Sequence, residues 1–241
     1  MAILQILSLL GGLMVDTLEN EKPFVVVELF TSEGCSSCPP ADELLSEIVD
    51  GRYENTDVIG LSFHVDYWDY IGWKDPYASR DFTNRQRIYA EKLRSHQLYT
   101  PQMVVNGKHE FVGSNRQQWL KVYEIEAVSR SGLKMQVGEV VLSNSEVMFS
   151  VAVSPKEDVL INLALVERDL DQNVTRGENR GRKLSHDNVV RSYDVRRISG
   201  GQFNFELPVK PSMDLSKSSL VVYAQDPETY QILSAEKIDL K

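Results

Sequence analysis

The cysteines of this 241-residue chain are Cys35 and Cys38, and two serines separate them. The spacing suits reversible formation of a small disulfide ring, with one sulfur exposed and the other recessed. The pair follows the apolar run of residues 24–30 and precedes a helix-like stretch, so Cys35 falls at a predicted helix N-terminus. Backbone amides at such a terminus stabilise a thiolate. We therefore predict that Cys35 is a nucleophile and that Cys38 resolves the mixed disulfide.

Two other uses of such a pair need weighing. A structural disulfide, or two buried thiols, would use the same spacing without redox activity. A zinc site needs about four ligands, and the chain has no second cysteine pair. We expect no metal and no cofactor.

A second feature is Thr100-Pro101, which stands directly before Gln102, the apolar residues 103–105 and the turn pair Asn106-Gly107. An Asn-Gly pair between apolar runs predicts a hairpin. In the predicted order of elements, the start of this third strand passes beside the CxxC turn. A cis proline at Pro101 would leave neighbouring backbone groups free to bind a peptide or thiol substrate.

Four polar and aromatic residues close the second predicted strand: His64, Asp66, Tyr67 and Trp68. If the first two strands are parallel, their carboxyl ends share one edge of the sheet, where ligands bind. We expect these side chains to neighbour Cys35, with Asp66 or His64 relaying a proton to or from Cys38 and Trp68 lining a groove. The alternative is that His64 is a satisfied core histidine and that the aromatic rings pack the loop.

The periodicity predicts two domains and a leading segment. Residues 1–22 are an apolar N-terminal segment or the remnant of an export signal. Residues 23–131 read as strand, helix, strand, helix, hairpin and helix, which predicts an α/β domain. Residues 132–241 carry seven short alternating runs, including residues 147–153, 159–167, 189–197 and 203–209, and predict an all-β immunoglobulin-like sandwich.

Charge and composition limit the partners. The net charge of −9 argues against binding to nucleic acid or to anionic membranes. We expect a protein or small-molecule thiol or disulfide as substrate, no nucleic acid, and no membrane contact beyond the N-terminal segment. A periplasmic or secreted protein fits an export signal, whereas a cytoplasmic one fits an ordered apolar segment. Nothing in the sequence indicates the oligomeric state.

The strand, the CxxC turn and the Thr-Pro dipeptide together resemble the thioredoxin superfamily over residues 24–130. Thioredoxins carry Trp-Cys-Gly-Pro-Cys in the turn, whereas this chain has Gly34 before Cys35 and two serines after it. Peroxiredoxins carry a threonine three residues before the cysteine, and here Ser32 holds that place. The resemblance implies an α/β thioredoxin-like domain.

Three longer blocks resemble a bacterial domain family of unknown function, DUF1223. They are ELFTSEGCSSCPPAD at residues 28–42, HVDYWD at 64–69, and RGENRGR at 176–182 with HDN at 186–188. This resemblance implies a thioredoxin-like domain with an appended β domain, often exported, and supplies no substrate. Loops as long as residues 176–188 are often functional. Its arginines would reach over the CxxC face to hold an acidic substrate, or else the loop joins the two domains.

The function predicted from these observations is thiol–disulfide oxidoreductase. One alternative is a binding or adaptor protein that keeps a structural disulfide and uses the β domain for recognition. An exposed Cys35 of low pKa favours the enzyme, and a buried inert disulfide favours the binder. A thiol peroxidase, in which Cys35 passes through a sulfenic acid, is a further alternative.

Overall fold

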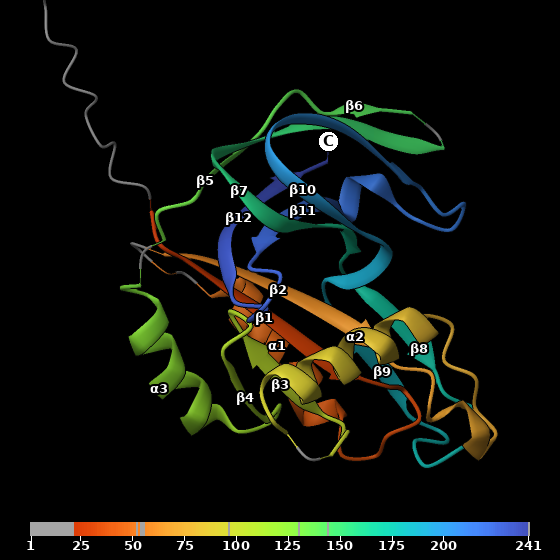
Figure 1. Ribbon diagram of the computed structural model, residues 1–241. Coiled ribbons are helices and arrows are strands. Elements are labelled where there is room, and N and C mark those ends of the chain that lie inside the picture. The colour runs from red at the N-terminus through yellow and green to blue at the C-terminus, as the bar shows by residue number, and fades with distance from the viewer. Residues whose placement is uncertain are drawn as a thin grey trace, which may run out of the picture.

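The computed structural model describes residues 22–240 apart from residues 52, 54, 55, 96, 130 and 144. The predicted N-terminal segment therefore lies outside the described residues except for Lys22. Within them, the chain forms one mixed sheet of ten strands and a separate two-stranded hairpin (Figure 1). Eight strands of the large sheet follow the order β12-β11-β7-β10-β2-β1-β3-β4, and β5 and β6 pair with β7.

The first half of the chain builds one end of this sheet and its helices. Its elements are β1 (Phe24–Thr31), α1 (Pro39–Asp50), β2 (Asp57–His64), the 3-10 turn η1 (Asp69–Ile71), α2 (Arg80–Lys92), β3 (Gln102–Val105), β4 (His109–Val112) and α3 (Arg116–Glu126). Strands β1 and β2 are parallel, whereas β3 is antiparallel to β1 and to β4. The predicted order of elements and the predicted directions of these strands are confirmed.

The second half of the chain is β-rich and contains two long strands. Its elements are β5 (Lys134–Val137), β6 (Val141–Leu142), β7 (Glu146–Glu167), β8 (Leu170–Asn173), β9 (Lys183–His186), β10 (Val189–Pro208), the 3-10 turn η2 (Leu215–Lys217), β11 (Ser218–Gln225) and β12 (Ile232–Asp239). Strands β7 and β10 pair along almost their whole length, and β8 pairs with β9 as a hairpin.

The predicted fold class, an α/β thioredoxin-like domain followed by a separate immunoglobulin-like sandwich, is wrong. Strand β10 joins β2 in parallel at Val189 and Ser62, so strands of both halves lie in the same sheet. Residues 147–153 and 159–167 belong to one strand, β7, as residues 189–197 and 203–208 belong to β10. The division at residues 131 and 132 stays a prediction.

The error has a physical cause in how strands end. Pro155 and the pair Gly200-Gly201 interrupt the alternating pattern, and such residues commonly mark turns. Here they stand inside the strands, where Gly200 and Gly201 have positive φ and the β7–β10 register shifts between Ser199 and Gly201. Alternation predicts that a segment is a strand, but it does not name the strand's partner.

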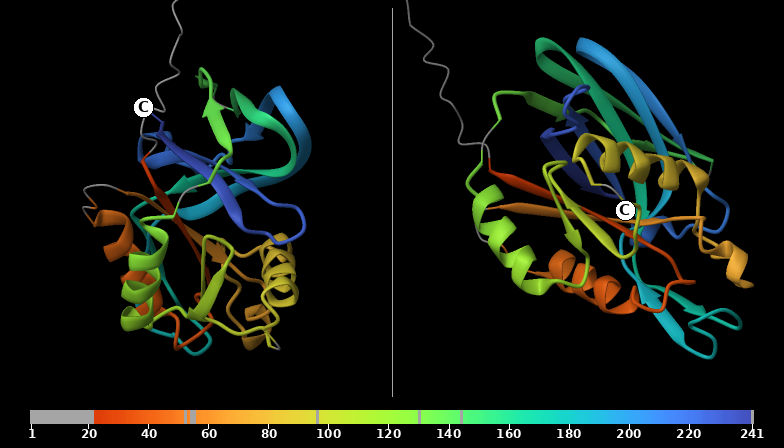
Figure 2. Two further views of the ribbon diagram at one scale, coloured as in Figure 1. Left: turned by 60° about the vertical axis from the view of Figure 1, so that its left-hand side comes forward. Right: turned by 60° about the horizontal axis from the view of Figure 1, so that its bottom comes forward.

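The valine-rich β1 is buried on both faces, which explains its continuous apolar run. Val25, Val27 and Leu29 pack with α1 and α3, whereas Val26 and Phe30 pack on the other face with α2 and with β11. Figure 2 shows α1 and α3 on one side of the sheet and α2 on the other. The C-terminal end of β1, where Cys35 follows, is thereby held between helices.

A buried polar network connects the two halves, and we call it the Arg85 cluster. Arg85 of α2 donates to Glu28 of β1 at 2.7 Å and to Asn162 of β7 at 3.0 Å. Tyr223 of β11 also donates to Glu28, at 2.9 Å. The members, all at most 5% exposed, are Glu28, Arg85, Tyr89, Asn162, Tyr223 and Gln225.

Candidate functional site

Cys35 and Cys38 form a disulfide at the junction of β1 and α1. Cys38 is the N-cap residue of α1, and Pro39 and Pro40 open the helix, where their missing amide donors cost little. Both cysteines are fully buried, whereas Ser36 and Ser37 between them are exposed. The position is the predicted one, but the expectation of one exposed sulfur is not met.

The disulfide turn is covered by the loop of residues 174–182, which connects β8 to β9. The side-chain amide of Asn179 donates to the carbonyl oxygens of Glu33 and Cys35, both at 2.9 Å. The backbone N–H of Ser36 donates to the Glu178 carboxylate at 3.1 Å. Strand β9 contacts α1, so the hairpin lies along the helix that carries the pair (Figure 2). We call residues 174–182 the covering loop.

Glycine lets the covering loop approach the turn. Gly177 has a φ of 72°, and a Cβ atom there would lie 3.2 Å from the side chain of Ile71. A Cβ atom on Gly34 would meet the same Ile71 side chain at 3.3 Å. Ile71 therefore packs between the covering loop and the residue that precedes Cys35.

Trp68, Thr100 and Pro101 lie at the same end of the sheet. The Thr100–Pro101 bond is cis, as predicted. Gln102 pairs with Phe30, so Pro101 lies beside the C-terminal end of β1. The Trp68 indole donates to the Thr100 hydroxyl at 2.7 Å, and a Cβ atom on Gly34 would lie 2.9 Å from the Trp68 Cβ. The structure thus brings Trp68 and Thr100 together next to the disulfide turn.

Asp66 is hydrogen-bonded to α2, and Tyr67 packs against the core cluster that contains Phe30 and Phe63. The Asp66 carboxylate accepts a hydrogen bond from Thr83 of α2 at 2.5 Å, and its backbone N–H donates to the same hydroxyl at 3.1 Å. Tyr67 is half-buried, and burial raises the pKa of its phenol. A role for either residue in binding substrate stays a prediction.

His64 belongs to a buried cluster of acidic and basic groups, which we call the His186 cluster. His64 Nδ1 lies 2.7 Å from an oxygen of Asp75, and its ring meets that of His186 edge to face with centroids 4.8 Å apart. His186 of β9 lies 3.4 Å from a Glu33 oxygen and 3.8 Å from an Asp42 oxygen. The members, all at most 5% exposed, are Glu33, Asp42, His64, Asp75 and His186.

The electrostatics of this cluster favour a proton on Asp42 and on His64 and disfavour one on Asp75. Burial raises the pKa of Asp42, although the neighbouring His186 and His64 act against it. Burial alone would lower the pKa of His64, but the charge and hydrogen bond of Asp75 outweigh burial and raise it. Burial acts upward on the pKa of Asp75 as well, yet the pairing with His64 lowers it overall.

Several atoms of the His186 cluster are buried without a hydrogen-bond partner in the described part of the chain. They are Glu33 Oε1, Asp42 Oδ1, His64 Nε2 and both ring nitrogens of His186. Buried polar atoms in native proteins are almost always hydrogen-bonded, so a group of exceptions calls for an explanation such as catalysis or a bound species. Asp42 follows Cys38 by four residues, one turn along α1 on the same helix face.

Residues 26–225 match the family model described as "Protein of unknown function (DUF1223)". The chain belongs to this family. The structure resembles that of protein AGR_C_4864 from Agrobacterium tumefaciens, with 30% sequence identity, a TM-score of 0.66, and 90% of this chain and 94% of that chain covered.

The fold is also similar to that of HBP35 of Porphyromonas gingivalis, with a TM-score of 0.62. The identity is 15%, and the match covers 91% of this chain and 76% of that one. No curated protein sequence matches the chain.

The sequence reasoning missed five members of the site in this DUF1223 protein: Glu33, Asp42, Asp75, Asn179 and His186. Glu33, Asp42 and Asn179 lie inside the blocks that carry the resemblance, so those blocks were the signal that could have found them. His186 lies in the last block too and received no role. Asp75 lies in an irregular loop, and no sequence pattern singled it out. The covering loop reaches the disulfide turn through Asn179 and Glu178, whereas its Arg176, Arg180 and Arg182 are exposed.

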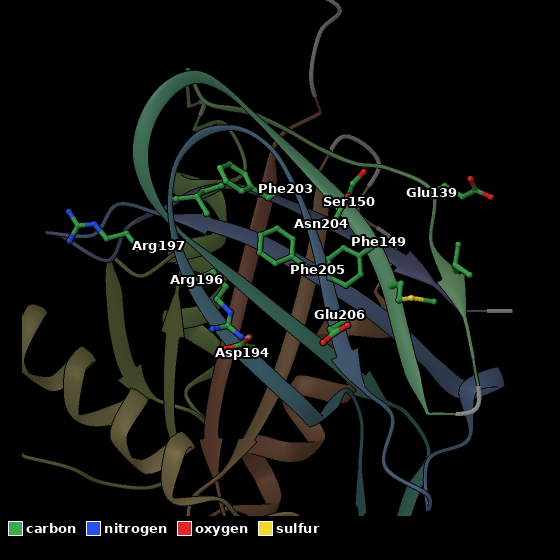
Figure 3. A pocket seen from close by; sticks show the side chains of 13 residues that line it. Glu139, Phe149, Ser150, Asp194, Arg196, Arg197, Phe203, Asn204, Phe205 and Glu206 are labelled. Carbon is green, nitrogen blue, oxygen red and sulfur yellow. Dashed lines mark ion pairs between the residues drawn. The ribbon is translucent and has the colours of Figure 1, made fainter.

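A cavity of about 830 Å³ lies elsewhere in this DUF1223 protein, between β7 and β10. Phe149, Phe203 and Phe205 form its apolar wall, and Arg196 pairs with Asp194 at its edge (Figure 3). None of the predicted site residues lines it, and the disulfide lies outside it.

Two observations bear on location and metals. No helix in the described part of the chain is long and apolar enough to cross a membrane. A disulfide is consistent with a protein outside the cytoplasm. Among the described residues, no three or more His, Cys, Asp or Glu side chains are arranged to hold a metal ion.

Proposed function

We propose that this DUF1223 protein is a thiol–disulfide oxidoreductase that works through Cys35 and Cys38. The observation that carries the proposal is the disulfide at the junction of β1 and α1, with Glu33 and Asp42 of the buried His186 cluster two and four residues from Cys35 and Cys38. A purely structural disulfide does not need acidic and basic groups that are buried and only partly hydrogen-bonded, because such groups cost stability.

The proposed reaction is thiol–disulfide exchange, and it runs in either direction. A substrate thiolate attacks Cys35 Sγ, a bond forms between the two sulfurs, and the Cys35–Cys38 bond breaks with its electron pair on Cys38 Sγ. A second substrate thiolate then attacks the substrate sulfur of the mixed disulfide and releases Cys35. Two substrate thiols are oxidised to one disulfide, and the protein disulfide is reduced to two thiols.

The His186 cluster supplies or takes the proton at Cys38. Burial raises the pKa of Asp42, so this carboxyl group holds a proton more readily than an ordinary aspartic acid. Asp42 stands one helical turn from Cys38, and we assign to it the proton that the leaving Cys38 thiolate needs. His186, 3.8 Å from Asp42, is placed to replace that proton.

The substrate lies, in this proposal, against Trp68, Thr100 and Pro101. Two arguments support the assignment: the Trp68–Thr100 hydrogen bond beside Gly34, and the arrangement of a CxxC turn next to a Thr-Pro dipeptide that the sequence shares with the thioredoxin superfamily. We propose a periplasmic or secreted location, where disulfides persist.

The test is a turnover assay with matched cysteine variants. Wild-type protein, Cys35→Ser and Cys38→Ser are compared in the reduction of insulin by dithiothreitol and in the refolding of a scrambled disulfide protein. Wild type should accelerate at least one reaction, Cys35→Ser should not, and Cys38→Ser should accumulate a mixed disulfide. Wild type that performs like buffer in both assays would refute the proposal.

A second candidate is a binding protein with a structural disulfide, and the burial of both cysteines favours it. The two functions differ in the reduced protein. A structural disulfide that closes a loop as short as residues 35–38 adds about 2 kcal/mol to the stability of a domain, so its reduction should lower the free energy of unfolding by about that much. An oxidoreductase keeps its fold in both redox states. Unfolding in urea, with and without dithiothreitol, separates the candidates.

A further inference from the structure

Three backbone groups of the disulfide turn are occupied by two side chains of the covering loop. The carbonyl oxygens of Glu33 and Cys35 accept from the Asn179 amide, and the N–H of Ser36 donates to the Glu178 carboxylate. Asn179 is 1% exposed, although it comes from a loop 144 residues further along the chain.

These contacts have the chemistry of a bound polypeptide. A peptide backbone offers N–H donors and C=O acceptors, as the neighbouring Asn179 amide and Glu178 carboxylate do here. Extended peptides commonly bind proteins through such main-chain hydrogen bonds. A thiol without amide groups, such as dithiothreitol, has no comparable pair of groups with which to replace both contacts.

The covering loop is built to reach this position without belonging to the large sheet. Strands β8 and β9 pair only with each other among the described strands, and Gly177 and Gly181, both with positive φ, flank Glu178 and Asn179. The loop can therefore be displaced without breaking a strand pair of the large sheet. Cys35, whose carbonyl oxygen the covering loop holds, is fully buried.

We propose that Glu178 and Asn179 mimic a substrate backbone and hold the disulfide closed until an extended polypeptide dithiol displaces them. The proposal rests on the proposed function for its substrate class. It names polypeptides, rather than small thiols, as the natural substrates, and the covering loop as an autoinhibitory element.

The test measures reduction of the protein disulfide, without turnover. The reaction is one dithiol plus the Cys35–Cys38 disulfide, giving the dithiol's own disulfide and two protein thiols. Wild type, Asn179→Asp and Asn179→Ala are each reduced by dithiothreitol and by an extended synthetic peptide with a CxxC dithiol. Arg180→Ala, in the same loop but exposed, is the matched control. Circular dichroism establishes that each variant is folded.

Asn179→Asp keeps the shape of the side chain but turns an acceptor toward two carbonyl oxygens, so it should open the covering loop most. Loss of these hydrogen bonds should accelerate reduction by dithiothreitol about tenfold in both Asn179 variants and leave Arg180→Ala at the wild-type rate. Reduction by the peptide should gain less from the substitutions, because the peptide displaces the loop in wild type.

Two results would overturn the inference. If dithiothreitol reduces wild type and both Asn179 variants at one rate, the loop does not close the disulfide. If the substitutions accelerate reduction by dithiothreitol and reduction by the peptide by the same factor, the covering loop shields the disulfide but does not mimic a bound polypeptide. Both results are independent of insulin turnover, so the oxidoreductase proposal fails or survives separately.

Discussion

The Arg85 cluster and the His186 cluster are both buried and both contain charged groups, but they differ in how completely their atoms are hydrogen-bonded. In the Arg85 cluster every side-chain nitrogen and oxygen of the six residues takes part in a hydrogen bond. In the His186 cluster five such atoms have no hydrogen-bond partner in the described part of the chain.

The difference teaches which cluster serves the fold. The Arg85 cluster joins α2 to β1, β7 and β11, and the guanidinium also lies over four aromatic rings with centroids 5.0–5.6 Å away. A fully satisfied network rigidifies and specifies a core. The His186 cluster has ion-pair contacts of 3.4 and 3.8 Å without a full set of hydrogen bonds, and its members Glu33 and Asp42 lie two and four residues from Cys35 and Cys38. Incomplete hydrogen bonding near the disulfide is what we expect if the His186 cluster transfers protons, as proposed above.

The largest expected effect comes from breaking the satisfied cluster. Arg85→Met leaves the Glu28 carboxylate buried without its cation, which typically costs 3–5 kcal/mol, so we expect a loss of about 4 kcal/mol in the free energy of unfolding. Urea denaturation measures it. Arg87→Met, two residues along α2 and exposed, is the control and should change stability by less than about 0.5 kcal/mol.

The double variant Glu28→Gln, Arg85→Met sharpens this comparison. Removing both charges should restore part of the loss, because replacing a buried ion pair is less harmful than leaving one partner alone. A single Arg85→Met variant as stable as wild type would mean that the Arg85 cluster does not hold the two halves together.

The next largest effect is expected in the His186 cluster, and it should appear in the rate of substrate turnover rather than in the free energy of unfolding. Asp42→Asn removes the proton that we assign to Cys38 and should slow turnover by about a hundredfold, the usual scale of general acid–base catalysis. The free energy of unfolding at pH 8 should stay the same or rise by up to about 1 kcal/mol, since a buried carboxylate is lost. The neighbouring exposed Glu43→Gln is the control.

The pH profile separates proton donation from a structural role for Asp42. If Asp42 donates the proton, the turnover rate of wild type should fall with rising pH as Asp42 loses its proton. This part of the pH–rate profile should be absent in Asp42→Asn. If Asp42→Asn turns over substrate at the wild-type rate and with an unchanged pH–rate profile, the His186 cluster does not have the proton-transfer role proposed for it.

How much the sequence could predict differs between the two clusters. The CxxC pair, the strand before it, the helix after it and Pro101 are local signals, and each was found. His64 was selected because it closes a strand, but its partner Asp75 lies in an irregular loop. His186 reaches Glu33 and Asp42 across more than 140 residues, and only the topology brings them together.

The Arg85 cluster could not be predicted for a related reason. Glu28 stands inside a valine-rich strand and Arg85 inside a helix, and neither position is unusual in sequence. Their partner Asn162 lies in β7. The sequence pattern predicted two separate strands there, residues 147–153 and 159–167, because Pro155 interrupts the alternation. Interpreting the second half as a separate sandwich removed Asn162 and Tyr223 from the core of the first half, where both are fully buried.

The smallest expected effect is a pH dependence of stability that belongs to His64. The pKa of His64 is raised above its ordinary value, so protonated His64 stabilises the folded protein. This contribution is fully present below about pH 6.5 and is lost as pH rises through the raised folded-state pKa. Wild type should therefore become less stable between pH 6 and pH 9, as measured by urea denaturation.

His64→Gln should flatten that decline, and Asp75→Asn should flatten it too, because the Asp75 carboxylate is what raises the pKa of His64. The pKa of Asp42 is raised above its ordinary value, whereas the pKa of Asp75 is lowered below its ordinary value. If His64→Gln declines between pH 6 and pH 9 as steeply as wild type, His64 is neutral in the folded protein.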